Sequence, residues 1–256
     1  MVELFGEVAD DYDEIRPGYP AALAATILAY HGGPPSRLVE VGAGTGLATA
    51  LLRDLVAPAG PDAPAHPARV TCVEPDARMA AVLTARFPDV EVVVTRFEQW
   101  SPPPAGVPLL ACALAWHWLD PDTRNRRAHD ALAPGGTLAV LAHRYDYVDP
   151  AQSAAIRAAF ESVDPQPHHD RPEDWFLADI TGSGLFTDVR SVALRRSVPL
   201  TTAGYQRLVG TFSPQLRRPP QLRERVLEAV GDAVDGFGGT VTLDLRTTLV
   251  LARRPA

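Results

Sequence analysis

The sequence contains no lysine, and it has 24 arginines. Without lysine, the chain has neither the amine of a Schiff-base enzyme nor the lysine of a phosphate-binding loop. It also lacks the Tyr/Lys pair that short-chain dehydrogenases use. This one absence therefore excludes three large classes of enzyme.

Cysteine is almost as rare, because the chain has only Cys72 and Cys112. Both stand inside apolar runs that predict buried strands, and neither has a Cys or His nearby at metal-ligand spacing. His168, His169 and Asp170 are also ligand types, but adjacent side chains point in different directions, which favours a solvated loop. We therefore expect no disulfide framework, no metal site and a reducing, cytoplasmic compartment.

Positive charge and long apolar runs are scarce as well. The formal net charge is -7 and the sequence pI is about 5.5, so no general basic field attracts phosphate backbones or anionic lipid headgroups. Residues 1–20 contain no apolar stretch preceded by positive charge, and nowhere do ~18 apolar residues follow one another. We expect neither nucleic acid nor a membrane as a partner.

What the sequence does have is a regular alternation of short apolar runs and helical patterns. The expected strands are 37–41, 70–73, 90–94, 109–115 and 137–142, and the expected helices are 47–55, 76–86 and 121–132. Asp76 and Asp120 are the expected N-caps of the last two helices, APGG at 133–136 is expected to end the third helix, and the Pro-rich residues 57–68 predict a loop. The alternation predicts an α/β fold, doubly wound and Rossmann-like, around a mostly parallel sheet.

The last third of the chain changes character. Residues 189–198 and 240–252 predict longer strands that pair as an antiparallel edge, with helices around 202–211 and 220–235. A helix at 151–163 and an irregular stretch with Trp175 and Phe176 are expected to form a lid. We expect a single domain over 1–256, divided as follows: an N-terminal segment 1–36, a core 37–142, cap insertions 143–182 and 199–238, and edge strands 183–198 and 239–252.

The most informative segment is LVEVGAGTGLAT at residues 38–49, where a strand ends near Glu40 and glycines stand at 42, 44 and 46. Glycine lets the backbone turn tightly, so main chain can approach a ligand at the carboxyl edge of the sheet. A dinucleotide fingerprint needs its third glycine at position 47, where this chain has Leu47. The spacing therefore favours a different cofactor.

These residues resemble the first motif of class I methyltransferases, and the resemblance extends over most of residues 1–142. It implies S-adenosylmethionine as the cofactor. Glu74, at the end of the second strand, would accept hydrogen bonds from ribose hydroxyls, while Phe97 would pack on adenine and Glu98 would accept from its amino group. The cofactor-binding residues implied by the resemblance are Tyr12, Arg16, Glu40, Gly42, Ala43, Gly44, Gly46, Glu74, Pro75, Met79, Phe97, Glu98, Ala115 and Trp116.

The segment VADDYDEIRPGYP at 8–20 resembles the opening of a bacterial group similar to trans-aconitate methyltransferases, where this element covers the cofactor. The resemblance places Tyr12 and Arg16 near the methionine end, where a guanidinium pairs with a carboxylate in a fork geometry. Tyr19 would line the mouth of the site. The alternative is that Arg16 only anchors an N-terminal helix.

The segment ALAWHWLD at 113–120 brings two indoles and an imidazole to the carboxyl edge of the sheet. By the same resemblance Trp116 and Trp118 would contact cofactor or acceptor and His117 would be the catalytic base, a role that its unperturbed pKa of ~6.5 suits. Unlike the family, the fourth strand begins with apolar residues rather than an acidic one. The alternative is a packed, structural histidine.

Further aromatic residues are candidates to bind an acceptor, or else to pack in the core. The expected acceptor-binding residues are Tyr19, Trp118, Tyr145, Trp175, Tyr205 and Phe212. The implied reaction is in-line methyl transfer to a small molecule whose nucleophile (O, N or C) is open. The alternative is a cofactor-binding protein of the same fold that acts as a non-methylating cyclase or binding module.

Overall fold

The computed structural model describes residues 4–56, 69–165, 172 and 175–256. It packs the chain into two compact units, each made from three separate segments. Unit 1 comprises Met1–Arg16, His143–Arg171 and Leu194–Arg246, and unit 2 comprises Pro17–Ala142, Pro172–Ala193 and Thr247–Ala256. The residues predicted as one cap insertion, 143–182, are thus distributed over both units.

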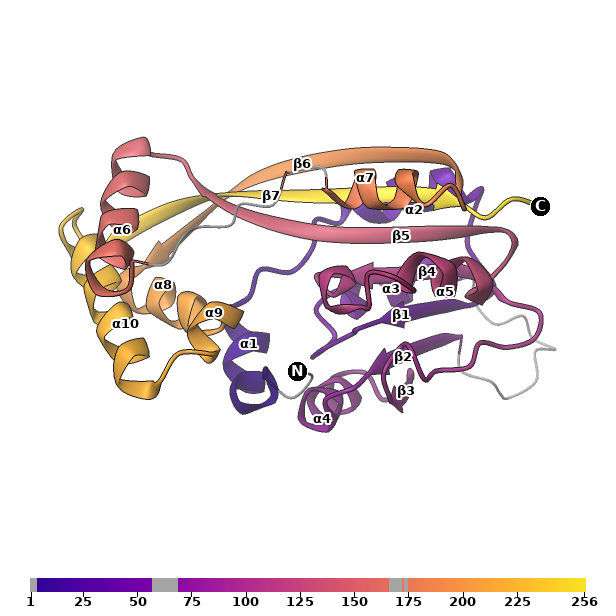
Figure 1. Cartoon of the computed structure of the whole chain (residues 1–256), viewed down its shortest axis with the longest axis horizontal. Helices are drawn as coiled ribbons and strands as arrows, with labels where there is room; N and C mark the ends of the chain where they lie inside the picture. Colours follow the sequence, from indigo (N-terminus) through magenta and orange to yellow (C-terminus); the bar gives the residue numbers. More distant parts are fainter. Residues whose placement is uncertain (1–3, 57–68, 166–171, 173–174) are drawn as a thin grey trace. The chain divides into compact units, whose positions relative to one another are not determined.

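A seven-stranded sheet with the order β3-β2-β1-β4-β5-β7-β6 organises the chain (Figure 1). Its strands are β1 (Leu38–Val41), β2 (Val70–Glu74), β3 (Glu91–Val94), β4 (Val107–Ala113), β5 (Leu132–Tyr147), β6 (Thr187–Thr201) and β7 (Thr240–Arg253). β1 to β5 are parallel, with Glu40 opposite Cys72 and Ala111. Together with the antiparallel edge formed by the last strands, this confirms the predicted fold class.

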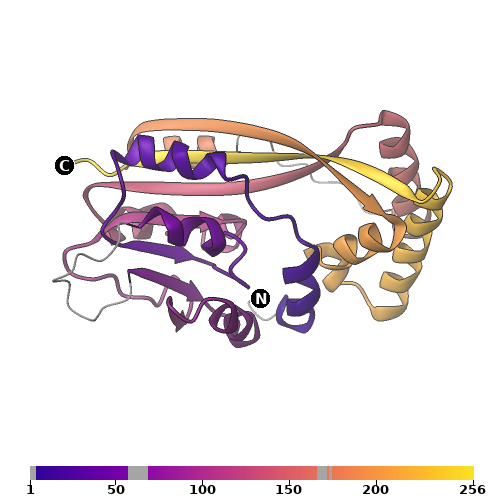
Figure 2. The ribbon, with the colours of Figure 1, turned by 180° about the vertical axis from the view of Figure 1, so that it is seen from behind.

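The helices of unit 2 surround these strands. They are α2 (Ala22–His31), α3 (Thr49–Leu52), α4 (Ala77–Arg86), α5 (Arg124–Ala131) and α7 (Trp175–Gly182), with 3-10 turns η2 (Arg53–Leu55) and η3 (Trp116–Trp118). α7 lies in front of β6 and β7 in Figure 1 and α2 lies in front of them in Figure 2, so the two helices cover opposite faces of this part of the sheet. Strands covered on both faces are mostly apolar. β1 and β2 are buried along their whole length, and their polar residues are Glu40, Thr71 and Glu74.

Two of the predicted helix starts had different outcomes. The Asp76 carboxylate accepts from the Arg78 N–H at 2.9 Å, which confirms Asp76 as the N-cap of α4. The expectation for Asp120 was wrong, because α5 begins at Arg124 with Thr123 as its N-cap. Asp120 instead accepts from the Asp122 N–H and the Thr123 hydroxyl, both at 3.0 Å, and so stabilises the turn before the helix.

The segment APGG does not precede the fifth strand but lies inside it, which corrects the prediction of a strand over 137–142. Val107 of β4 pairs with Leu132, whereas Leu109 pairs with Thr137, so β5 carries extra residues at this point. Gly135 supplies the left-handed backbone, with φ of 74°, that such a bulge requires.

The expectation of an irregular stretch at Trp175 and Phe176 was also wrong, because both residues lie in α7. Phe176 and Ile180 are buried in the core of unit 2 among residues of β4, β5 and β7. The predicted loop 57–68 and the triplet His168, His169 and Asp170 lie outside the described residues.

Unit 1 is a helical cluster packed on parts of the last three strands. Its helices are α1 (Ala9–Ile15), α6 (Pro150–Val163), α8 (Thr202–Gly210), α9 (Ser213–Leu216) and α10 (Pro220–Asp235), after a 3-10 turn η1 (Gly6–Val8). Its core contains Ile156, Leu208, Val230 and Val241. Arg207 of α8 binds Asp11 and Glu14 of α1 at 2.9 and 2.6 Å, which fixes the N-terminal helix to the cluster.

Candidate active site

The glycine loop follows β1 at the carboxyl edge of the parallel strands in unit 2. Gly42, Gly44 and Gly46 have φ of 67°, 58° and 90°, in the left-handed region that residues with side chains rarely adopt. Two of them also lack room for a side chain: a Cβ on Gly42 would lie 2.3 Å from the Ala115 Cβ, and one on Gly46 would lie 2.5 Å from Leu83 Cδ1. The loop is therefore packed at both ends.

Gly44 is the open point of this loop. Of the described residues beyond its neighbours, only Met79 comes within 4 Å of a Cβ placed there, through its terminal methyl at 3.4 Å. The Gly44 N–H donates to Glu74 Oε2 at 2.8 Å, and Glu74 Oε1 accepts from the Asp76 N–H at 2.9 Å. The Glu74 carboxylate thus ties the loop after β1 to the loop after β2.

Glu74 keeps the capacity to bind more donors. Burial raises the pKa of its carboxyl, while the N–H groups of Asp76 and Gly44 act against this shift. Each carboxylate oxygen can accept more than one hydrogen bond, so the two backbone donors leave acceptor positions for ribose hydroxyls. Pro75 beside it is half-buried, and Ala43 and Met79 are buried.

Glu40 lies under the loop. Its residue is 1% exposed, and its carboxyl group accepts from the Thr49 hydroxyl at 2.5 Å at the start of α3. Burial raises the pKa of Glu40 to about 8, with the Thr49 hydrogen bond acting against the shift and the charge of Glu74 adding to it. In this arrangement Glu40 contacts the protein interior, and its predicted contact with the cofactor stays a prediction.

The turn after β4 contacts the glycine loop through Ala115. It begins at Leu114, a non-glycine residue with φ of 54°, and closes with a hydrogen bond of 2.8 Å from the Trp118 N–H to the Ala115 carbonyl. His117 and Trp118 are half-buried, with ring centroids 4.9 Å apart. The turn after β4 and the glycine loop therefore meet at Ala115 and Gly42.

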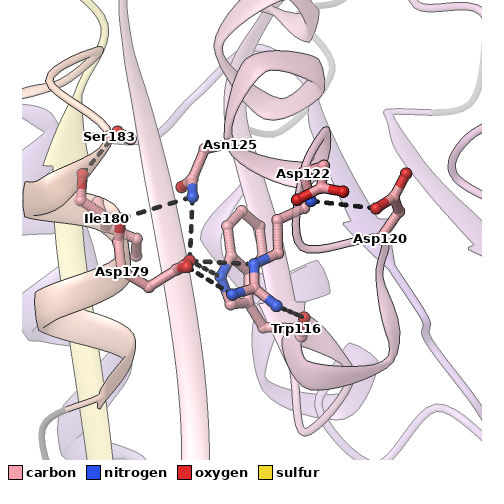
Figure 3. A network of polar contacts seen from close by, with 8 residues as sticks. Trp116, Asp120, Asp122, Asn125, Asp179, Ile180 and Ser183 are labelled. Carbon is pink, nitrogen blue, oxygen red and sulfur yellow. Dashed lines mark hydrogen bonds and ion pairs between the residues drawn. The ribbon is translucent and has the colours of Figure 1, made fainter.

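Trp116, in contrast, is 1% exposed, and its indole lies inside the unit. Its Nε1–H donates to Asp179 Oδ2 of α7 at 2.8 Å (Figure 3). Arg124 of α5 donates to the same carboxylate through Nε at 3.0 Å and Nη2 at 2.5 Å, and Asn125 Nδ2 donates at 3.0 Å. Asp179 and Arg124 are absent from the sequence prediction, because no local pattern relates residues 55 positions apart.

The adenine-binding candidates Phe97 and Glu98 follow β3. Phe97 is 3% exposed, and its ring stacks on Trp100 with centroids 6.2 Å apart in the core. Glu98 Oε1 accepts from the Asp120 N–H at 3.2 Å. Of the two, the half-buried Glu98 is therefore the more accessible to a ligand, and both contacts with adenine stay predictions.

The acceptor-binding candidates of unit 2 come from three different segments of the chain. Tyr19 is half-buried before α2, and Trp118 belongs to the turn after β4. Trp175 packs against the core, and the Arg124 guanidinium carbon lies 5.2 Å from the centroid of its ring. The core-packing alternative therefore describes Trp175 in this structure.

Arg16 is surrounded by aromatic rings within unit 1. Its guanidinium carbon lies 4.9 Å from the ring centroid of Tyr12, 5.7 Å from that of Tyr145 and 4.5 Å from that of Phe212. Arg16 also donates to the Thr211 hydroxyl at 2.8 Å, to the Thr211 carbonyl at 2.9 Å and to the Tyr145 hydroxyl at 3.3 Å. These contacts match the anchoring alternative, and its contact with a cofactor carboxylate stays a prediction.

The remaining candidate, Tyr205, is 2% exposed in the core of unit 1. Its hydroxyl shares a 2.5 Å hydrogen bond with Tyr147, and burial raises the pKa of both phenols. Tyr205 therefore lies in the interior, whereas Tyr145 and Phe212 are half-buried and pack on each other with ring centroids 5.2 Å apart.

Other kinds of site find no support in the described part of the chain. No group of three or more His, Cys, Asp or Glu residues there is arranged to hold a metal ion. None of the helices described is both long and apolar enough to cross a membrane.

Comparison with known proteins finds similarity in the part of the chain that carries the glycine loop. Residues 38–136 match the family described as a methyltransferase domain. The chain is thus similar to methyltransferases over these residues. An uncharacterized methyltransferase of Mycobacterium tuberculosis is 27% identical over 228 residues, which cover 88% of this chain and 83% of the relative.

Solved structures share the fold of this chain. A protein of Anaeromyxobacter dehalogenans, described as a type II methyltransferase, has a TM-score of 0.67 at 20% identity, covering 94% of this chain and 99% of that one. A phosphoethanolamine N-methyltransferase of Haemonchus contortus, solved with S-adenosylhomocysteine, has a TM-score of 0.54 at 13% identity. The match covers 98% of this chain and 58% of that one.

The matched residues 38–136 contain most of the candidate site but not all of it. The glycine loop, Glu74 and the turn Leu114–Trp118 fall within them, as does Arg124. Asp179, which receives hydrogen bonds from Trp116 and Arg124, lies outside the matched residues in sequence although it belongs to the same unit.

Proposed function

We propose that the protein transfers a methyl group from S-adenosylmethionine to a small-molecule acceptor at the carboxyl edge of β1, β2 and β4. The observation that carries the proposal is the open glycine at position 44, held by the Glu74 carboxylate. A loop with left-handed glycines brings main chain close to a ligand, and the acidic side chain at the next strand end can accept hydrogen bonds from a ribose.

The donor set fits an adenosyl cofactor rather than a dinucleotide. Near Gly44 the loop has space that a Cβ would fill, and the nearest side-chain atom is the flexible end of Met79. Leu47 stands where a dinucleotide fingerprint needs glycine. Similarity in fold to an enzyme solved with S-adenosylhomocysteine supports the same cofactor class.

In this proposal the backbone of Gly42 to Gly46 and the carboxylate of Glu74 hold the cofactor, which supplies an electrophilic methyl group on a positively charged sulfur. The protein aligns the acceptor with that methyl and excludes water, an effect of roughly 7–11 kcal/mol for well-oriented groups. His117, half-buried on the turn after β4, would take the proton from an acceptor that carries one.

The partners and the compartment follow the same reasoning. We propose a small molecule as acceptor, because the acidic chain offers no general field for nucleic acid. The two buried, unpaired cysteines suit a reducing cytoplasm.

Calorimetric titration of the full chain with S-adenosylhomocysteine tests cofactor binding. We expect the wild type to bind and Gly44→Val to bind at least about tenfold more weakly, because the new side chain fills the open point and strains the loop. Gly184→Val is the matched control, since Gly184 has a similar φ of 67° and nothing within 4 Å of its Cβ position. Absence of binding by the wild type, or equal binding by Gly44→Val, would reject the proposed cofactor site.

Methyl transfer itself is tested with labelled cofactor and a panel of small carboxylates, phenols and amines. Label on a product is the expected result, and His117→Ala should slow its appearance without abolishing it, because a base contributes ~10²–10⁴-fold. Binding without labelled product across the panel would favour a protein that binds the cofactor but does not transfer methyl.

A further inference from the structure

One carboxylate in unit 2 gathers donors from a distant part of the chain. Asp179 of α7 accepts hydrogen bonds from Trp116, Arg124 and Asn125, which lie 54 to 63 residues earlier (Figure 3). The side chains of Arg124 and Asp179 are 9% and 18% exposed. The hydrogen bonds from Arg124, Trp116 and Asn125 lower the pKa of Asp179 against the opposing effect of burial, so the group is ionised at neutral pH.

These bonds hold Trp116 at both its side chain and its main chain. The indole N–H donates to Asp179, and Arg124 Nη1 donates to the Trp116 carbonyl at 3.4 Å. A buried ion pair is weak evidence for stability, because a well-packed apolar group often stabilises as much. Directional hydrogen bonds also fix the orientation of the groups that they join. Here they orient Trp116 and with it the turn after β4.

That turn needs to be held. Leu114 has φ of 54°, a backbone conformation that costs energy for a residue with a side chain. The turn buries Trp116 and leaves the neighbouring His117 and Trp118 half-buried. A strained conformation persists only where its surroundings fix it. The Leu114 N–H donates to the Leu141 carbonyl at 2.9 Å, and Asp179 and Arg124 hold Trp116 two residues further along the turn.

Ala115 links the turn to the glycine loop. Its Cβ lies 2.3 Å from where a Cβ on Gly42 would stand, so the Ala115 methyl occupies the space that a side chain at position 42 would need. The Gly42 N–H in turn donates to the Val73 carbonyl at 2.8 Å. A shift of the turn at Trp116 therefore displaces Ala115 against the first glycine of the loop.

We infer that Asp179 is a positioning residue, which holds the turn Leu114–Trp118 against the glycine loop and so sets the affinity of the site for the adenosyl cofactor. The inference rests on the proposed function. It assigns α7, which lies outside the matched domain residues, a part in cofactor binding through Trp116, Ala115 and Gly42 rather than by direct contact.

The test compares Asp179→Asn with Asp164→Asn in the full chain. Asp164 forms a similarly buried pair with Arg218, with side chains 12% and 13% exposed and a separation of 2.8 Å, but this pair lies in unit 1. We expect both variants to melt at lower temperature than the wild type. At a temperature where circular dichroism finds all proteins folded, Asp179→Asn should bind S-adenosylhomocysteine about tenfold more weakly, and Asp164→Asn should bind it as the wild type does.

Trp116→Phe keeps an aromatic side chain but removes the indole N–H that donates to Asp179, so it tests the inference if Asp179→Asn does not fold. We expect a several-fold loss of affinity for S-adenosylhomocysteine, and a smaller further loss when Asp179→Asn is added, because coupled changes are not additive. If the wild type binds and the variants of Asp179 and Trp116 bind equally well, the network serves stability alone and the inference is overturned. A wild type that does not bind overturns the proposed function together with the inference.

Discussion

Among single residues, Glu40 shows most clearly how burial changes chemistry. Burial raises its pKa to about 8 from an ordinary value of 4.5, so the folded protein keeps the proton over a pH range in which the unfolded chain has lost it. The folded state therefore binds more protons between these values, and its stability must fall as the pH rises through that window. Above about pH 8 the Glu40 carboxyl is ionised in both the folded and the unfolded state, so it no longer makes the free energy of unfolding depend on pH.

Glu40→Gln removes this titration while keeping a similar shape. We expect the free energy of unfolding of the wild type to fall relative to that of the variant between about pH 4.5 and 8, by up to about 1.4 kcal/mol per pH unit. Urea unfolding of both proteins at pH 5, 6.5 and 8 measures the difference. Glu74 is present in both proteins, so its own titration largely cancels, and a difference independent of pH would contradict the assigned protonation.

The glycines of the loop are required for different reasons. Gly42 and Gly46 combine left-handed φ with contacts that exclude a side chain, whereas Gly44 has the conformation but open space above it. The sequence reveals the spacing of the three but not this difference. Only Gly44 therefore offers a substitution that blocks a ligand without pressing on another element.

At the scale of elements, α4 illustrates a helix whose start is encoded locally. The Asp76 side chain caps it, and the same residue donates its N–H to Glu74, so the helix start is joined to the carboxylate proposed to bind the cofactor. α7 is the opposite case. This eight-residue helix is held by the packing of Phe176 and Ile180 on the core, since isolated helices of that length are unstable in water.

The cap of α4 gives a prediction at this scale. Asp76→Ala removes the acceptor for the Arg78 N–H and should lower the free energy of unfolding by about 1 kcal/mol. Asp76→Asn keeps an acceptor oxygen and should lose much less, apart from the ion pair with the half-exposed Arg78. Chemical denaturation of the three proteins measures this, and equal losses in the two variants would assign the effect to charge rather than capping.

For the whole molecule, charge is the property that the sequence controls directly. A formal net charge of -7 opposes binding to polyanions over any large surface. The 24 arginines do not reverse this, because many are held in pairs such as those of Arg207 with Asp11 and of Arg195 with Asp244. We therefore expect the molecule not to bind nucleic acid.

Electrophoretic mobility shift of the full chain with duplex DNA and with structured RNA checks this bias. At about 0.15 M salt, where the Debye length is about 8 Å, we expect no retained nucleic acid at micromolar protein. A shift that weakens steeply as salt increases would contradict the expectation and indicate a local basic surface.

Much of the fold was predictable because its signals are local. Alternating apolar runs and helical patterns predicted the order of strands and helices. The glycine spacing with Glu74 predicted a cofactor site at the carboxyl edge, and that site stays a prediction. The extent of β5 was not predictable, because APGG has the composition of a turn and only pairing with Val107 and Leu109 makes it a bulge. The helix α7 was not predicted either, because its stability depends on the packing of Phe176 and Ile180 on the core of unit 2.

By itself the sequence determined the fold class, the glycine loop and the exclusion of lysine-dependent chemistry, since each follows from residue types and short spacings. Only the tertiary structure decided the side-chain contacts. Glu40 accepts a hydrogen bond from Thr49, Trp116 donates one to Asp179, and the Arg16 guanidinium lies beside three aromatic rings. The physical reason is that such contacts join residues up to 196 positions apart. Their energies depend on burial and geometry, which only packing creates.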